Sequence, residues 1–390
     1  MIQDWLLELG KGIGKVFLNP LFYWAFALII LVGIRRVKEE RRLFGTKVLD
    51  IFTEWKDTWG FSIFIGLFYS VLTIAIGMIV SYEMIFILSI VTIVLSLTLR
   101  FSLLSPSYTL GITLIVLMLL PIAGDYLDFL PQLSEFNFSV IAIMLALFLF
   151  VEAHFLSRIK VHDTFPSLIK GARGSWIGLH YIKKLAVIPF FTLVPSGLIE
   201  PFAPYWPFLT VGNENYAIVL IPFVLGFEFS VRGSLPHEAA NRIAIKLLGL
   251  AVIVLAVAVG SIFLSWLSIV TVAIAIAGRE ILNYQHRTKD QAKASYFNHT
   301  NDGLKVLGVI PGSPADRLNI LIGETVTKVN GTRIQCEDHL YEALQQTGSF
   351  FKVELIDNKG EIRFVQSAMY EGDHHELGLI FAGEPYRKNK

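Results

Sequence analysis

The sequence predicts a polytopic α-helical membrane protein with about eight or nine transmembrane helices, followed by a small C-terminal α/β domain. Hydrophobic residues make up 54% of the 390 residues and charged residues only 17%, against roughly a quarter charged in soluble domains. Apolar runs of about 20 residues, long enough to cross a bilayer, recur as far as Gly278. From Arg279 onward the sequence carries charges and Gly and Asn turns. This composition excludes an ordinary soluble enzyme, and the net charge of +1 gives no concentrated basic surface for nucleic acid.

Nine candidate spans are bounded by charge, Gly or Pro. They cover about 16–34, 59–80, 84–100, 107–123, 138–156, 185–200, 216–231, 244–262 and 264–279. The last two run together, and only Gly260, Ser261 and Ser265 indicate a turn between them. Without that turn the count is eight, which would place the C-terminus on the other side of the membrane.

Basic residues favour nine spans. The loops after the first, third, fifth and seventh spans carry Lys and Arg, whereas the alternate loops near 81–83, 124–137 and 201–215 carry none. Short basic loops remain on the cytoplasmic side. We therefore expect an external N-terminus and a cytoplasmic C-terminal domain, where the single cysteine, Cys336, suits a reducing compartment.

These observations predict five regions along the chain. Residues 1–15 have apolar residues at helical spacing, which indicates an amphipathic helix on the membrane surface. The polytopic region covers 16–279, a linker covers 280–299, the C-terminal domain covers 300–383 and a basic tail covers 384–390.

The membrane region shows no catalytic pattern. The segment beginning His237-Glu238 resembles a zinc-peptidase motif, but Asn241 stands where the second histidine ligand is needed. We interpret it as the start of a helix after Pro236, and we expect no catalytic residue, metal or cofactor.

Three ionisable residues lie within predicted spans, where such residues are functional candidates. Glu152, His154 and Glu228 are all near predicted cytoplasmic ends. From there they can reach the headgroups or pair with Arg158 and Arg232, which favours interface anchoring over a proton or ion path.

The C-terminal region has clear turn signals. An alternating strand at 303–310 precedes a turn in which Gly312 permits the bend, Ser313 can cap the next helix and Pro314 suits its first position. Asn330-Gly331 favours a hairpin. An amphipathic helix at 337–346 and two closing strands at 351–356 and 361–365 complete the pattern.

This order, with Pro-Gly-Ser-Pro-Ala at 311–315 and Val-Asn-Gly at 329–331, resembles a bacterial PDZ domain across about 303–381. The resemblance implies that an extended peptide adds as a strand. The carboxylate-binding loop normally precedes the domain, whereas its nearest match here comes at the end, as in a permuted order. The implied peptide-binding residues are Leu377, Gly378, Leu379, Leu340 and Leu344, although the last two could equally pack in the core.

The whole chain combines Asn-Pro-Leu-Phe-Tyr at 19–23, a basic loop at 35–42, a polytopic region and one C-terminal PDZ-like domain. It resembles the MinJ family of cell-division topological determinants. The resemblance implies a non-enzymatic membrane scaffold at the septum and cell poles, a possible homo-oligomer, which bridges DivIVA-like and MinD-like proteins. Two alternatives stay open from the residues alone: a relative of site-2-type intramembrane proteases, and a transporter or secretion component with a regulatory PDZ domain.

Overall fold

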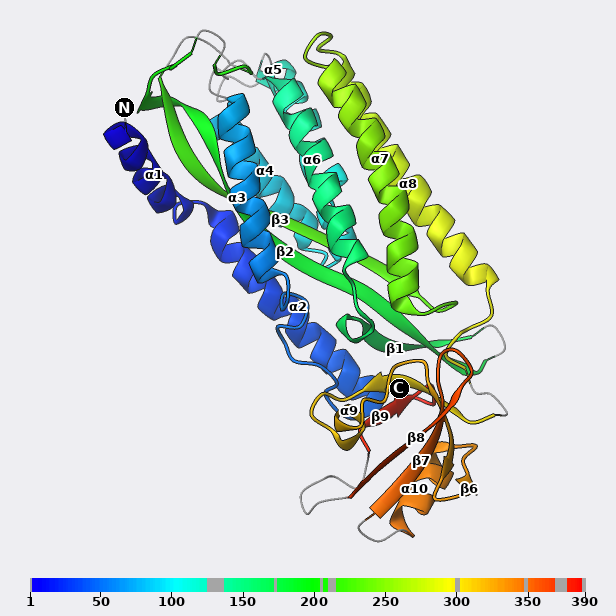
Figure 1. Cartoon of the computed structure of the whole chain (residues 1–390). Coiled ribbons are helices and arrows are strands. Elements are labelled where there is room, and N and C mark those ends of the chain that lie inside the picture. The colour runs from blue at the N-terminus through cyan, green and yellow to red at the C-terminus, as the bar shows by residue number, and fades with distance from the viewer. Residues whose placement is uncertain are drawn as a thin grey trace.

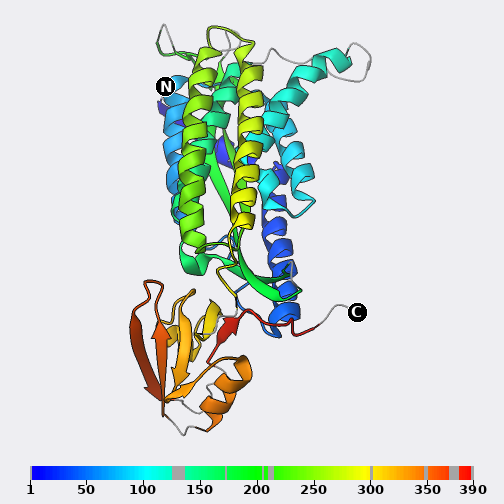
Figure 2. The same ribbon diagram turned by 90° about the vertical axis from the view of Figure 1, so that its right-hand side faces the viewer.

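The computed structural model describes residues 2–124, 137–171, 174–203, 206–209, 215–298, 302–346, 350–368 and 377–387. It contains an elongated bundle of helices around a long β-hairpin, with a small α/β domain at one end (Figures 1 and 2). We call this end of the bundle the domain end and the opposite one, where the N-terminus lies, the far end (Figure 1).

Seven apolar helices form most of the bundle. Five of them are long and apolar enough to cross a membrane: α2 (Pro20–Phe44), α3 (Trp59–Ile76), α6 (Phe138–Ser157), α7 (Pro236–Gly260) and α8 (Leu267–Ala292). The others are α4 (Tyr82–Ser96) and α5 (Pro106–Gly124). They coincide with the first five and the last two predicted spans, which is consistent with a membrane protein. α6 is the central helix, because 83% of its most apolar stretch is buried inside the protein.

Predicted spans six and seven are strands, so the prediction that all eight or nine spans are helices is wrong. β2 (Trp176–Ile199) and β3 (Tyr216–Val231) form an antiparallel hairpin that runs through the bundle (Figure 1). Pro189 and Pro222 lie opposite each other in its ladder. A proline inside a helix removes a hydrogen bond and clashes with the preceding turn, whereas a strand accepts one where its nitrogen faces an outer edge.

Helix α3 closes the outer edge of β2. The amide of Phe191 donates to Ser70 Oγ over 2.8 Å, and the carbonyl of Phe191 accepts from Thr73 Oγ1 over 2.8 Å. Gly66 allows the two backbones to touch, because a Cβ at this position would lie 2.0 Å from the carbonyl oxygen of Pro189. The edge groups therefore have partners inside the bundle, as a strand edge in a membrane requires.

Both ends of this edge are closed in the same way. Toward the domain end, the Leu185 amide donates to the Glu54 carbonyl over 3.0 Å and the Leu185 carbonyl accepts from Thr58 Oγ1 over 3.2 Å. Toward the far end, the Leu193 carbonyl accepts from the Val80 amide over 2.8 Å. Residues before and after α3 therefore also form hydrogen bonds with backbone groups on this edge of β2.

Other elements cover the outer edge of β3. Helix α1 (Ile2–Val16) packs there through Gly12, where a Cβ would lie 2.6 Å from the Ile218 carbonyl oxygen. Nearer the domain end, the short helix η1 (Phe101–Leu104) packs against the strand, and the Phe101 amide donates to Glu228 Oε2 over 3.1 Å. A helix therefore forms where the amphipathic segment was predicted, and one of its faces contacts β3; its position on a membrane surface stays a prediction.

Glu152 and Glu228 do not pair with the arginines that the sequence suggested. Glu152 is completely buried, accepts a hydrogen bond from Ser105 Oγ over 2.6 Å and lies 2.6 Å from Nη2 of the buried Arg279. It thus joins α6 to α8 instead of pairing with Arg158, because the helices converge around it and exclude it from the surface. Glu228 lies 3.8 Å from Lys183, its neighbour across the β2–β3 ladder, and not beside Arg232.

The C-terminal domain has its elements in the predicted order. They are β4 (Leu304–Val309), α9 (Pro314–Arg317), β5 (Thr325–Val329), β6 (Thr332–Arg333), α10 (Glu337–Gln345), β7 (Phe350–Ile356), β8 (Ile362–Ala368) and β9 (Leu379–Phe381). The sheet runs in the order β8-β7-β5-β4-β9, with β6 beside β5. β9, the last strand of the chain, is therefore an edge strand.

Candidate functional site

The turn before α9 holds the loop that enters β9. Ser313 caps α9 by accepting from the Asp316 amide over 3.3 Å. The Ile310 amide donates to the Gly378 carbonyl over 2.9 Å, and the Ala315 amide donates to the Leu377 carbonyl over 3.0 Å. These bonds bring the Pro-Gly-Ser-Pro-Ala segment together with the predicted peptide-binding loop at Leu377 and Gly378, which follows some sixty residues later in the chain.

Gly378 is required by this geometry. Its φ of 78° lies in the left-handed region that favours glycine. A Cβ at this position would also lie 2.3 Å from Ser313 Cβ. The close approach of the loop to the turn therefore depends on the missing side chain.

The candidate peptide-binding residues are brought together in space. Leu340 and Leu344 of α10 share one hydrophobic cluster with Leu377 and Leu379, and all four are less than 10% exposed. They form part of the domain core as the structure stands. At this place β9 pairs with β4 on one side and with no strand on the other among the described residues, and its three residues are buried.

The opposite face of β9 rests on the membrane bundle. Ile380 and Ala382 belong to a buried cluster that also includes residues of both the bundle and the domain: Leu43, Val48, Leu168, Leu235, Phe297, Leu307 and Ile322. The chain after β9 continues to α2, where the amide of Tyr386 donates to the Leu43 carbonyl over 2.9 Å. We call this contact surface the seat of the domain.

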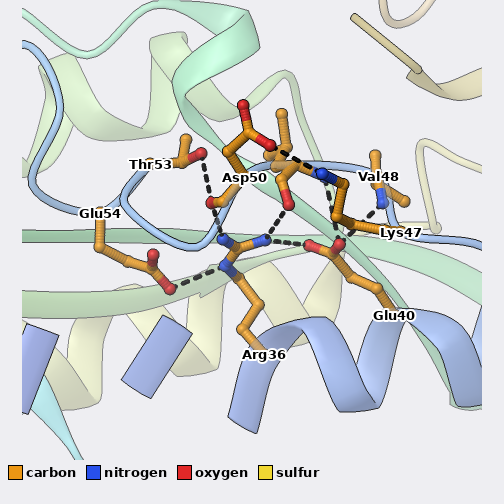
Figure 3. A network of polar contacts seen from close by, with 8 residues as sticks. Arg36, Glu40, Lys47, Val48, Asp50, Thr53 and Glu54 are labelled. Carbon is orange, nitrogen blue, oxygen red and sulfur yellow. Dashed lines mark hydrogen bonds and ion pairs between the residues drawn. The ribbon is translucent and has the colours of Figure 1, made fainter. Parts of the chain in front are cut away.

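A charged network holds the bundle side of the seat (Figure 3). Arg36 binds Glu40 one turn away on α2 and Glu54 over 2.8 Å, and it also binds the carbonyl of Asp50. Glu40 Oε2 in turn accepts from the Val48 amide over 2.8 Å. The network fixes the loop after α2, and this loop presents Val48 to the domain.

His180 forms a direct hydrogen-bonded link between the two parts. It lies in the stretch of β2 that pairs with β1 (Phe165–Lys170) at the domain end, before the strand enters the bundle. One ring nitrogen lies 2.8 Å from Thr164 Oγ1 and the other 2.9 Å from the Leu307 carbonyl oxygen of β4. Burial lowers the pKa of His180 from 6.5 to about 3, although the bond to Leu307 opposes this effect. The joint therefore contains a neutral imidazole.

Sequence reasoning missed the seat. Arg36 and Glu40 have the spacing of an ion pair on one helix face. The basic residues of this loop were interpreted only as an indication of which side of the membrane the loop lies on. His180 had no signal, because its partner is a backbone carbonyl on a distant strand. Within the described residues no cluster of three potential metal ligands occurs.

Comparison with known proteins gives a full-length relative. No family model matches the chain. The chain is 36% identical over 388 residues to the cell division topological determinant MinJ of Bacillus subtilis, covering 98% of this chain and 96% of that protein. A probable cell division topological determinant MinJ of Lacticaseibacillus paracasei is 30% identical over 84 residues, which are 22% of this chain and 23% of that protein.

The first match extends over both the membrane bundle and the C-terminal domain, at an identity that shows common descent. The chain therefore belongs to the MinJ family of cell division topological determinants.

Proposed function

We propose that this protein is a non-enzymatic membrane scaffold that helps to place the division septum. In this proposal the bundle anchors it at the septum and cell poles, and the C-terminal domain works as a permuted PDZ domain. Its partners are a DivIVA-like protein and a MinD-like protein, which it bridges so that division is restricted to mid-cell.

The single observation that carries the proposal is the edge of β9 that pairs with no strand among the described residues, in a strand that shares a hydrophobic cluster with α10. Peptide-binding domains of this class take an extended peptide as an added strand, and the main-chain bonds supply much of the affinity. The loop at Leu377 and Gly378 is held by the turn before α9, so it is already in place at the start of that edge. The residues Leu340, Leu344 and Leu379 support the strand from inside the domain.

The distribution of charge supports a cytoplasmic domain. Arg35, Arg36, Arg158 and Lys184 all belong to the domain end of the bundle. Basic residues are retained on the cytoplasmic side of short loops. A reporter fused after Lys390 should therefore show cytoplasmic activity, and external activity would contradict the orientation.

Localisation tests the scaffold role. In dividing rods, a fluorescent fusion of the full chain should gather at the septum and poles. Deletion of residues 300–390 should leave membrane insertion intact and weaken recruitment of at least one partner, because the proposed peptide edge is lost. Normal partner localisation in the truncated strain would contradict the proposal.

A sharper variant is Gly378→Ala, which places a Cβ against Ser313. It should weaken partner recruitment by distorting the loop before β9. Gly360→Ala is the matched control, since Gly360 also has a positive φ of 88° but faces open space. Equal effects of the two variants would show that general strain, and not the β9 loop, is responsible.

A further inference from the structure

The side of the bundle between α3 and α7 contains an apolar groove. Its volume is about 580 Å³. Phe64 and Phe68 of α3 form one wall, Leu248 of α7 lines the other, and Leu147 and Phe150 of α6 line the groove between them. Phe64, Phe68 and Leu248 are each about half exposed. The groove therefore opens toward the surface that the bilayer surrounds.

A polar cavity adjoins the groove toward the domain end. Its volume is about 490 Å³, and it shares Phe61 and Phe64 with the groove. Arg158, Lys160, His162 and Lys184 supply its basic groups, and Asp57 and Asp163 its acidic ones.

Two of the basic groups are available to a ligand. Lys184 lies 3.4 Å from Asp163 and is thereby engaged. Arg158 and Lys160 are exposed, and neither forms an ion pair with a described residue. The Arg158 guanidinium lies 5.2 Å from the centre of the Phe61 ring. This contact places the cation at the boundary between the polar cavity and the apolar groove.

We propose that the two cavities together bind one anionic phospholipid. Its phosphate lies against Arg158 and Lys160, and one acyl chain occupies the groove between α3 and α7. The charge pattern selects this occupant. A partner helix or a second copy of the chain would fill both halves only if it carried acidic side chains opposite Arg158 and Lys160, and free phosphate would leave the groove empty.

The affinity should depend on both halves of the site. A cation near an anionic lipid surface contributes about 1 kcal/mol, which corresponds to about a fivefold change in affinity. Replacing both cations should therefore weaken binding by a factor on the order of ten or more. Shortening an apolar wall should weaken binding through the lost hydrophobic contact.

Native mass spectrometry of the full-length protein in detergent can measure this binding. Dioleoylphosphatidylglycerol is titrated against dioleoylphosphatidylcholine. We expect preference for phosphatidylglycerol, a loss of at least about tenfold in the Arg158→Gln/Lys160→Gln variant, and weaker binding in Phe64→Ala. Lys38→Gln is the matched control, because Lys38 is an exposed cation of α2 that lines neither cavity. It should change binding less than twofold, and unchanged thermal unfolding should show that each variant is folded.

Four outcomes would overturn the proposal. Equal binding of the two lipids would remove the role of charge. An unchanged affinity in the double variant would place the lipid elsewhere. Competition by inorganic phosphate as effective as that of the lipid, or a change of oligomer mass in Phe64→Ala without a change in lipid binding, would assign the cavities to a free anion or to a protein partner.

Discussion

The bundle and the C-terminal domain both contain a β-sheet, but they treat the sheet edges differently. In the bundle, side chains of Ser70 and Thr73 bind the edge of β2 at Phe191. In the domain, the outer edge of β9 pairs with no strand of the described chain. An unpaired backbone group in lipid costs several kcal/mol, whereas water can satisfy the same group in an aqueous domain.

Under the proposed function, this difference decides where a partner binds. The backbone groups on the edges of the hairpin have partners within the chain. We propose that the edge of β9 without a strand partner takes up a peptide strand instead. Variants of the covered edge should therefore affect folding, whereas variants around β9 should affect partner binding.

The largest effect is expected for Gly66→Ala. Its Cβ would lie 2.0 Å from the Pro189 carbonyl oxygen, a backbone atom that cannot move without shifting β2. We expect a loss of about 3 kcal/mol or more in stability, at or beyond the upper end of ordinary overpacking. Thermal unfolding in detergent measures it. Gly60→Ala is the control on the same helix, because Gly60 faces open space, and equal destabilisation of both variants would contradict the close contact.

A smaller effect is expected for Ser70→Ala, which removes the acceptor of the Phe191 amide. An unsatisfied buried donor costs about 1–3 kcal/mol. Ser62→Ala provides the comparison, since Ser62 Oγ is also buried on α3 but has no hydrogen-bond partner among the described residues. The same unfolding measurement should show little change for Ser62→Ala, and an unaffected Ser70→Ala protein would mean that the edge is sealed by other groups.

The third prediction concerns the joint between the two regions. Because burial lowers the pKa of His180 to about 3, the undocked state binds a proton more readily below pH 6.5. The stability of the docked state is thus fully present above about pH 6.5 and declines as the pH falls toward 3. At pH 5 the loss should be about 2 kcal/mol, seen as a lower unfolding midpoint.

Two variants distinguish the protonation of His180 from that of other groups. His180→Gln should remove the additional loss between pH 6.5 and 5. His339→Gln should retain it, because His339 is exposed on α10. A wild-type protein with the same midpoint at pH 7.5 and pH 5 would argue against a neutral imidazole in the joint.

The C-terminal domain was more predictable from sequence than the bundle. Its turns depend on local chemistry: Asn330 and Gly331 both have positive φ, and Ser313 caps a helix that begins with Pro314. Each predicted apolar run overlaps a helix or a strand, although α2 runs on to Phe44 and α8 to Ala292, beyond the predicted ends at 34 and 279. Hydropathy, however, shows only that a segment is apolar. A buried helix and a strand whose edges are covered can have the same hydropathy, so it did not distinguish them. Pro189 and Pro222 lie opposite each other in the hairpin, and this pairing joins residues far apart in sequence, which hydropathy cannot register.

The sequence alone determined that this is a membrane protein with a separate α/β domain, because composition and turn residues act locally. Only the tertiary structure decided that two apolar segments are strands, that Glu152 pairs with Arg279, and that β9 has one face on the bundle and one edge with no strand partner among the described residues. Each of these depends on partners brought together by folding. The physical reason is that a backbone or charged group in a low-dielectric interior must find a partner, and the chain order does not specify which one.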